Sequence, residues 1–86
     1  MKEGVIVYLV SSAATPPDFD PAAAGRALTP EAHRVELVSR EAGFFSVEDA
    51  WHFLYTQGCG RISLVVADAD VTGTLRPLGP RVRLCG

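Results

Sequence analysis

A cysteine between two glycines, Gly58-Cys59-Gly60, is the first motif in this chain that could do chemistry. Glycine loops that cradle phosphate follow a strand and open a helix, so that the N-terminus of the helix faces the anion. Here the order is reversed, because the preceding residues are predicted to form a helix and the following ones a strand. The carboxyl end of a helix also gives a thiolate no stabilisation. We therefore predict that Cys59 occupies a tight turn between a helix and a strand.

The second cysteine, Cys85, stands one residue before the end of the sequence, where a thiol could swing between partners. Over these two residues the tail resembles that of sulfur-relay proteins with a penultimate cysteine, although their second tail cysteine is missing here. It also resembles ubiquitin-like sulfur carriers, which end in two glycines, whereas Cys85 replaces the first of them. The resemblance implies a thiol-dependent carrier with Cys85 as the candidate thiol.

Oxygen-bearing side chains follow the two most apolar runs of the sequence. Ser11 and Ser12 come after the first run, and Asp68 and Asp70 come after the second. Ligands of open α/β sheets bind beyond the carboxyl ends of the parallel strands, so these four residues are the candidate ligand-binding site. Their oxygens suit a divalent cation. The alternative is that the two aspartates form a polar hairpin turn.

Other signatures of chemistry are missing from the sequence. His33 and His52 have no recognised metal-ligand spacing with each other or with the cysteines, and no C-x-x-C pair or nucleophile elbow occurs. We identify no catalytic residue, no metal site and no cofactor, so an enzyme is not favoured.

The charge pattern gives no general attraction to nucleic acid or to a membrane. Ten acidic residues outweigh eight Lys and Arg, for a formal net charge of -2. A DNA-reading helix would need basic or amide side chains near its start, where Glu48 and Asp49 stand instead. Arg76, Arg81 and Arg83 form a basic cluster, which we interpret as protection of an exposed sheet edge. Contact with RNA or an acidic partner is the alternative.

The elements that must position these residues begin with two strands. Val5–Val10 and Ile62–Ala67 are continuous apolar runs rich in β-branched residues, which predicts parallel core strands buried on both faces. Near the end of the chain, Val71–Leu75 and Arg81–Leu84 are separated by a turn rich in proline and glycine and are predicted to be short antiparallel strands.

Helices are predicted between the two core strands. The capping box Ser46-Val47-Glu48-Asp49 predicts a helix over 47–57. Asp20-Pro21 is typical of the start of a short helix, which would run through Leu28. Residues 30–42 are predicted to form another helix, although their alternation also fits an edge strand over 33–39.

Together these elements predict one α/β domain over residues 1–86. Its mixed sheet has about four strands, with two or three helices mainly on one face, or the order βαβαββ if residues 33–39 are a strand. The chain is 48% hydrophobic and 21% charged, as in ordinary globular domains. Because one face of an apolar sheet would stay open, we expect a protein partner or a homodimer against that face.

The location and the function are inferred by exclusion. The first apolar run is too short for an export signal or a membrane span, so we expect a cytoplasmic protein with reduced thiols. We expect a small binding or accessory domain that acts through protein–protein contacts, and binds neither DNA nor membranes. The alternative is the thiol-dependent carrier that uses Cys85.

Overall fold

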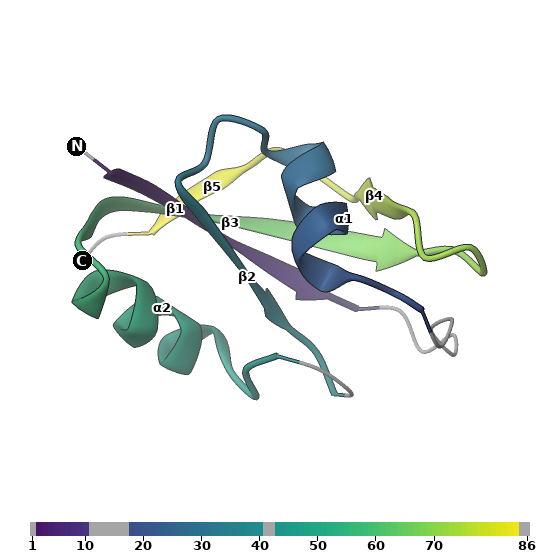
Figure 1. The fold of residues 1–86 in the computed structure, drawn as a ribbon, viewed down its shortest axis with the longest axis horizontal. Coiled ribbons are helices and arrows are strands. Elements are labelled where there is room, and N and C mark those ends of the chain that lie inside the picture. Colours follow the sequence, from purple (N-terminus) through teal and green to yellow (C-terminus); the bar gives the residue numbers. More distant parts are fainter. Residues whose placement is uncertain (1, 11–17, 41–42, 85–86) are drawn as a thin grey trace.

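The computed structural model describes residues 2–10, 18–40 and 43–84 and shows a mixed α/β fold, as predicted (Figure 1). In chain order its elements are β1 (Lys2–Leu9), α1 (Pro21–Leu28), β2 (Arg34–Val38), α2 (Val47–Thr56), β3 (Cys59–Ala69), β4 (Leu75–Pro77) and β5 (Val82–Leu84). All five strands belong to one sheet.

The two predicted core strands, β1 and β3, lie side by side at the centre of the sheet. The strand order is β2-β1-β3-β4, and β5 also pairs with β3. β1 is parallel to β2 and to β3, whereas β4 and β5 run antiparallel to β3. The eleven residues of β3 are enough to pair with β5 near its amino end and with β4 near its carboxyl end.

The segment 30–42 was predicted to be a helix, and that prediction is wrong. Its described part contains β2, so the alternative of an edge strand over 33–39 is confirmed. Leu37 and Val38 are both buried, and they point to opposite faces of the sheet. Each face is covered by a helix, and only a strand can bury adjacent residues on two faces in this way.

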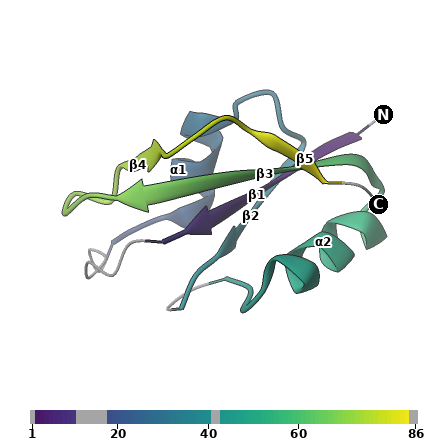
Figure 2. The same ribbon diagram turned by 180° about the vertical axis from the view of Figure 1, so that it is seen from behind.

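The helices lie on opposite faces of the sheet, which corrects the expectation that they share one face (Figures 1 and 2). α1 packs against the side of β1 that carries Val5 and Val7, whereas α2 packs against the side that carries Ile6. The strand order explains this arrangement. From β1 to β2 the chain moves to one side of β1, and from β2 to β3 it moves back past β1. Two right-handed crossovers in opposite directions place their helices on opposite faces.

Both helices begin where the sequence indicates. The Oδ1 of Asp20 accepts hydrogen bonds from the backbone N–H groups of Ala22 and Ala23, at 3.1 and 3.3 Å. The Oγ of Ser46 accepts one from the N–H of Asp49 at 3.1 Å. These caps satisfy N–H groups that have no partner within the helix, and the helix predicted over 47–57 is confirmed.

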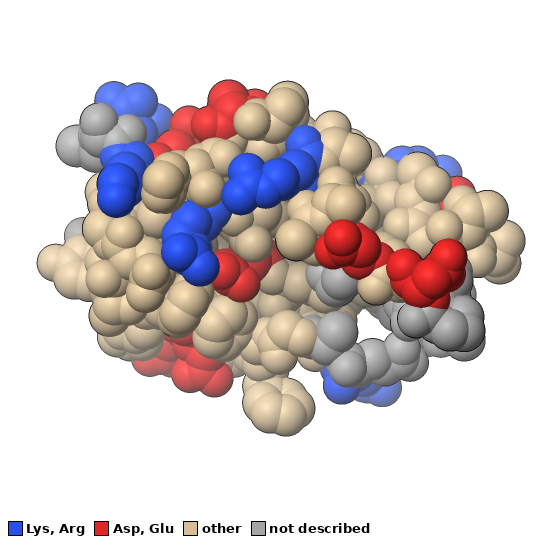
Figure 3. All heavy atoms as spheres, viewed as in Figure 1, with Lys and Arg blue, Asp and Glu red and all other residues tan. Residues whose placement is uncertain are grey.

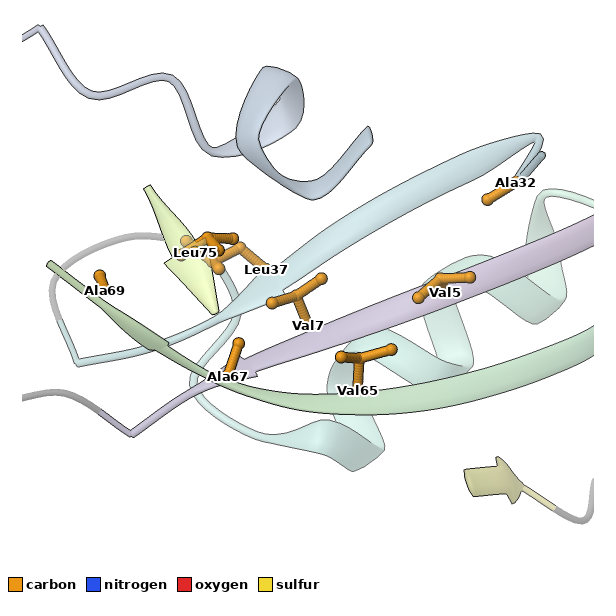
Figure 4. Packing of buried hydrophobic residues seen from close by; sticks show 8 residues of the cluster. All are labelled: Val5, Val7, Ala32, Leu37, Val65, Ala67, Ala69 and Leu75. Carbon is orange, nitrogen blue, oxygen red and sulfur yellow. The ribbon is translucent and has the colours of Figure 1, made fainter. Parts of the chain in front are cut away.

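The core has two parts, one on each face of the sheet. Figure 4 shows the part on the α1 side, where the side chains of β1 and β3 point to the same side as Leu37 and Leu75. The residues of this part of the core are all at most 6% exposed: Val5, Val7, Ala32, Leu37, Val65, Ala67, Ala69 and Leu75. The part on the α2 side is Ile6, Val38, Ala50, Leu54, Cys59 and Ile62.

Candidate functional site

The predicted ligand-binding residues are only partly described. Ser11 and Ser12 lie outside the described residues. Asp70 is exposed just after β3, and its Oδ1 accepts hydrogen bonds from the N–H of Thr72 at 2.9 Å, the hydroxyl of Thr72 at 2.6 Å and the N–H of Thr74 at 3.0 Å. These hydrogen bonds hold the pKa of Asp70 below its ordinary value, and the bond from the Thr72 hydroxyl lowers this pKa the most. Asp70 thus closes the turn between β3 and β4.

Asp68 lies on the same face of the sheet as α2, directly opposite Arg76 in the pairing of β3 with β4. Its Oδ2 is 3.8 Å from Nη2 of Arg76, and its Oδ1 accepts a hydrogen bond from the N–H of Ala69 at 2.9 Å. Within residues 2–10, 18–40 and 43–84, no group of three His, Cys, Asp or Glu residues could hold a metal ion. Ligand binding by Ser11, Ser12, Asp68 and Asp70 therefore stays a prediction.

Of the two cysteines, the structure describes Cys59. Cys59 is the first residue of β3, only 2% exposed, and belongs to the core beneath α2. Its Sγ would lie 3.1 Å from a Cβ placed on Gly4 of the neighbouring strand, so the packing around the thiol is tight. The helix-to-strand turn occupies Gln57 and Gly58, and Cys59 follows it as a core side chain. Cys85 lies outside the described residues, and its role as a carrier stays a prediction.

The basic cluster near the end of the chain is largely engaged in ion pairs. Arg81 pairs with Glu31, and its Nη1 lies 3.8 Å from Oε1 of Glu3, so it ties the start of β5 to β1 and to the loop before β2. Hydrogen bonds from its own backbone N–H and from Arg81 hold the pKa of Glu31 below the ordinary value. On the face seen in Figure 3, acidic and basic side chains are interspersed, and no continuous basic surface forms there.

The first turn of α1 is no anion site either. Asp20 caps it with a carboxylate, which already accepts from two of the free N–H groups. A phosphate would have to displace that carboxylate and then lie beside its negative charge.

A hollow of about 230 Å³ lies at the edge of β2. One of its residues, Glu36, is half-buried, and this burial raises the pKa of its carboxyl against a smaller lowering by Arg34. The lining residues are Asp20, Ala22, Val35, Glu36, Leu37 and Gly43.

An uncovered apolar sheet face was expected from the sequence, but its position was not. The structure has an apolar surface on the α2 side of the sheet, which we call the open face. Its members alternate along β1 and β3 and continue across the strands that follow β3. They are Tyr8, Val10, Leu64, Val66, Leu78 and Val82. Four of them are 37% to 52% exposed, and Leu64 and Val66 are half-buried.

Strand pairing brings these side chains together. Tyr8 pairs with Val66, and the N–H of Leu78 donates to the carbonyl of Val66 at 2.8 Å, which makes one row across three chain segments. Leu64 pairs with Val82 in the next row. Directly paired residues point to the same face of a sheet. The open face is therefore continuous over β1, β3 and the segments that border β3.

The length of α2 explains why this surface is uncovered. The ten residues of α2 span about 15 Å, whereas the eleven residues of β3 span about 36 Å. α2 covers the amino half of the sheet, where Leu54 lies close to Gly4 and Ile6 is fully buried. Figure 2 shows that no described helix lies under the carboxyl half of β3 on this side.

One flank of α2 borders the open face. Phe53 lies toward β2, where it packs on Phe44 and under the guanidinium of Arg34. At 100° per residue, Trp51 and Tyr55 fall on the opposite flank, toward β3 and β5. Their rings stack with centroids 5.3 Å apart, and Tyr55 is largely exposed. The open face and this flank together form a surface of apolar and aromatic side chains.

No known protein family, curated protein or solved structure matches this chain. Neither helix that the structure describes, α1 or α2, has the length and apolar character needed to cross a membrane.

Proposed function

We propose that this protein is a small binding domain that acts through protein–protein contacts at the open face. The observation that carries the proposal is the unequal cover of the two sheet faces. On the α1 side, the residues of β1 and β3 that point toward α1 are buried: Val5, Val7, Val65, Ala67 and Ala69. On the other side, Tyr8 and Val66 are partly exposed. Contiguous exposed apolar surface of this kind marks interaction sites in soluble proteins.

The size of the open face supports this proposal. The six side chains of the open face, about 4.8 Å apart between strands and about 6.8 Å apart between rows, cover an area of roughly 200 Å². At about 25 cal/mol per Å², complete cover would contribute several kcal/mol before the entropy of association is subtracted. Association costs about 4–15 kcal/mol, so this face alone supports a weak contact, to which a matched polar rim would add.

The polar side chains of the described residues support a contact surface better than a catalytic site. Asp70 closes a turn, Asp68 faces Arg76, Arg81 bridges two glutamates, and Cys59 lies in the core. None of these arrangements supplies a base beside a nucleophile. The thiol carrier at Cys85, the cytoplasmic location and the absence of DNA binding rest on the sequence and stay predictions.

The test compares variants of equal chemistry inside and outside the open face. Val82→Glu places a carboxylate on the open face, whereas Val71→Glu makes the same change at an 81% exposed valine in the turn after β3. Gel filtration of tagged protein, added at about 1 mM to an extract of the source cells because a small interface holds only at high concentration, should show the wild type and Val71→Glu in a complex larger than the monomer. Val82→Glu should elute as the monomer. If all three elute alike, the open face is not a binding surface.

A further inference from the structure

We infer that the partner of the open face is a second copy of this chain, an inference that rests on the proposed function. An uncovered apolar sheet face is matched well by another such face, because two sheets pack about 10 Å apart with their side chains interdigitated. This chain presents such a face itself, with β-branched and leucine side chains at Leu64, Val66, Leu78 and Val82.

The edges of the sheet are less suited to self-association than its open face. On one edge, Phe44 donates to the carbonyl of Leu37 at 2.9 Å and accepts from the N–H of Ser39 at 3.3 Å, which covers the end of β2. On the other edge, β4 and β5 are only three residues long and carry the exposed side chains of Arg76 and Arg83. Short edge strands with charged side chains oppose edge-to-edge pairing.

A two-fold axis in the plane between two copies would bring the open faces together, and its limiting orientations are across the strands and along them. An axis across the strands would lay the outer side of each α2 on the open face of the partner. That side carries Glu48, Asp49 and His52, all exposed, and their burial against apolar side chains would leave charges unpaired. An axis along the strands avoids this burial, because each α2 then lies beside the β5 edge of the other copy.

The axis along the strands also matches the charges at the rim. With the axis between β3 and the β4–β5 row, Leu64 and Val66 of each copy face Val82 and Leu78 of the other. At the carboxyl end of this surface, Asp68 of each copy then faces Arg76 of the other. In the monomer these two side chains are only loosely paired, at 3.8 Å on the surface. A symmetric dimer repeats the cross-chain pair twice, as an isologous interface requires.

The area predicts a weak dimer. Two open faces bury roughly 400 Å² in total, and the Trp51–Tyr55 flank adds to this area. A standard stable interface buries about 1,200–2,000 Å². We therefore expect a monomer–dimer equilibrium at micromolar to millimolar concentrations, in which the purified chain is largely monomeric when dilute.

Sedimentation velocity of the purified chain, from about 10 μM to about 1 mM, tests the dimer over the concentration range of such weak interfaces. The wild type and Val71→Glu should move toward the dimer with the same dissociation constant. Val82→Glu and, as a second variant at a loop position, Leu78→Glu should weaken dimerisation at least about tenfold, which is 1.4 kcal/mol. Circular dichroism confirms that each variant is folded.

Charge reversal tests the orientation of the axis. Asp68→Arg and Arg76→Asp should each weaken the dimer, and the double variant should restore it, because the cross-chain pairs are re-formed with exchanged signs. Single reversals that dimerise like the wild type would overturn the proposed axis.

A purified chain that stays monomeric at every concentration would overturn the inference of a second copy. In that case, a complex in the extract that Val82→Glu still abolishes would leave the proposed function standing with a different protein as the partner. Loss of both the dimer and the extract complex would overturn the proposed function as well.

Discussion

Replacement of Gly25 in α1 by alanine sets two opposing effects against each other. In a helix interior, alanine is more favourable than glycine by about 1 kcal/mol. At this position, however, an added Cβ would lie 2.4 Å from Cγ1 of Val35 in β2, a distance that requires a shift of the valine or of the helix. Overpacking of this kind costs about 1–3 kcal/mol. We expect Gly25→Ala to lower the free energy of unfolding by up to about 2 kcal/mol.

The sign of the effect should reverse when the opposing methyl is removed. In a Val35→Ala background, the nearest atoms to the new Cβ are the Cβ at position 35, at 3.5 Å, and Cγ2 of Val7, at 3.7 Å, both ordinary contacts. There Gly25→Ala should stabilise the protein by about 1 kcal/mol, the full helix-propensity gain. The double-mutant cycle then gives a coupling of about 1–3 kcal/mol between positions 25 and 35.

Urea unfolding followed by circular dichroism and by the emission of Trp51, the single tryptophan, measures all four proteins. Gly79→Ala is the control, because nothing lies within 4 Å of a Cβ placed there, and it should change stability by less than about 1 kcal/mol. A similar gain from Gly25→Ala in both backgrounds would show that α1 does not pack closely on β2, and would refute the reasoning.

Three further outcomes follow from the structure. Asp20→Ala should lower the free energy of unfolding by about 1 kcal/mol through loss of the α1 cap. Asp20→Asn keeps the acceptor and should cost less, so equal losses in urea would contradict the cap. Glu36→Gln should raise Tm at pH 7, because burial raises the pKa of this carboxyl and its ionised form opposes folding. The penalty grows as pH rises from the unfolded to the folded pKa, so Tm of variant and wild type should converge below about pH 4; a constant difference would exclude a titration effect. Cys59 should resist iodoacetamide in the native protein and react after unfolding, as read by peptide mass spectrometry. Rapid native alkylation would place this thiol outside the core.

Local chemistry made several elements predictable from the sequence. The Ser46 capping box located α2, the Asp20-Pro21 pair located α1, and the two apolar runs located the parallel strands β1 and β3. Each of these signals depends on residues within one turn or one strand. Residues 30–42 carried two such signals at once, and Leu37 was the residue that fitted only the strand, because it must point away from Val38.

The long-range features could not be predicted in the same way. The cover of both faces depends on β2 lying on the far side of β1 from β3, and no local pattern encodes that order. The open face depends on the length of α2 relative to β3, so Tyr8, within a run typical of a strand buried on both faces, is partly exposed. Asp68 and Asp70 were expected to act together, yet one faces a neighbouring strand and the other closes a turn.

The central position of β3 also has a consequence for the order in which the protein folds. Three of the four strand pairings involve β3, and its pairing with β1 joins Gly4 to Ile62 across most of the chain. Contacts so distant in sequence form slowly, because a large loop must close first. During synthesis β1 emerges long before β3, and its apolar edge has only β2 as a nearby partner. Nascent chains that lack β3 should therefore be the form of this protein most prone to aggregation.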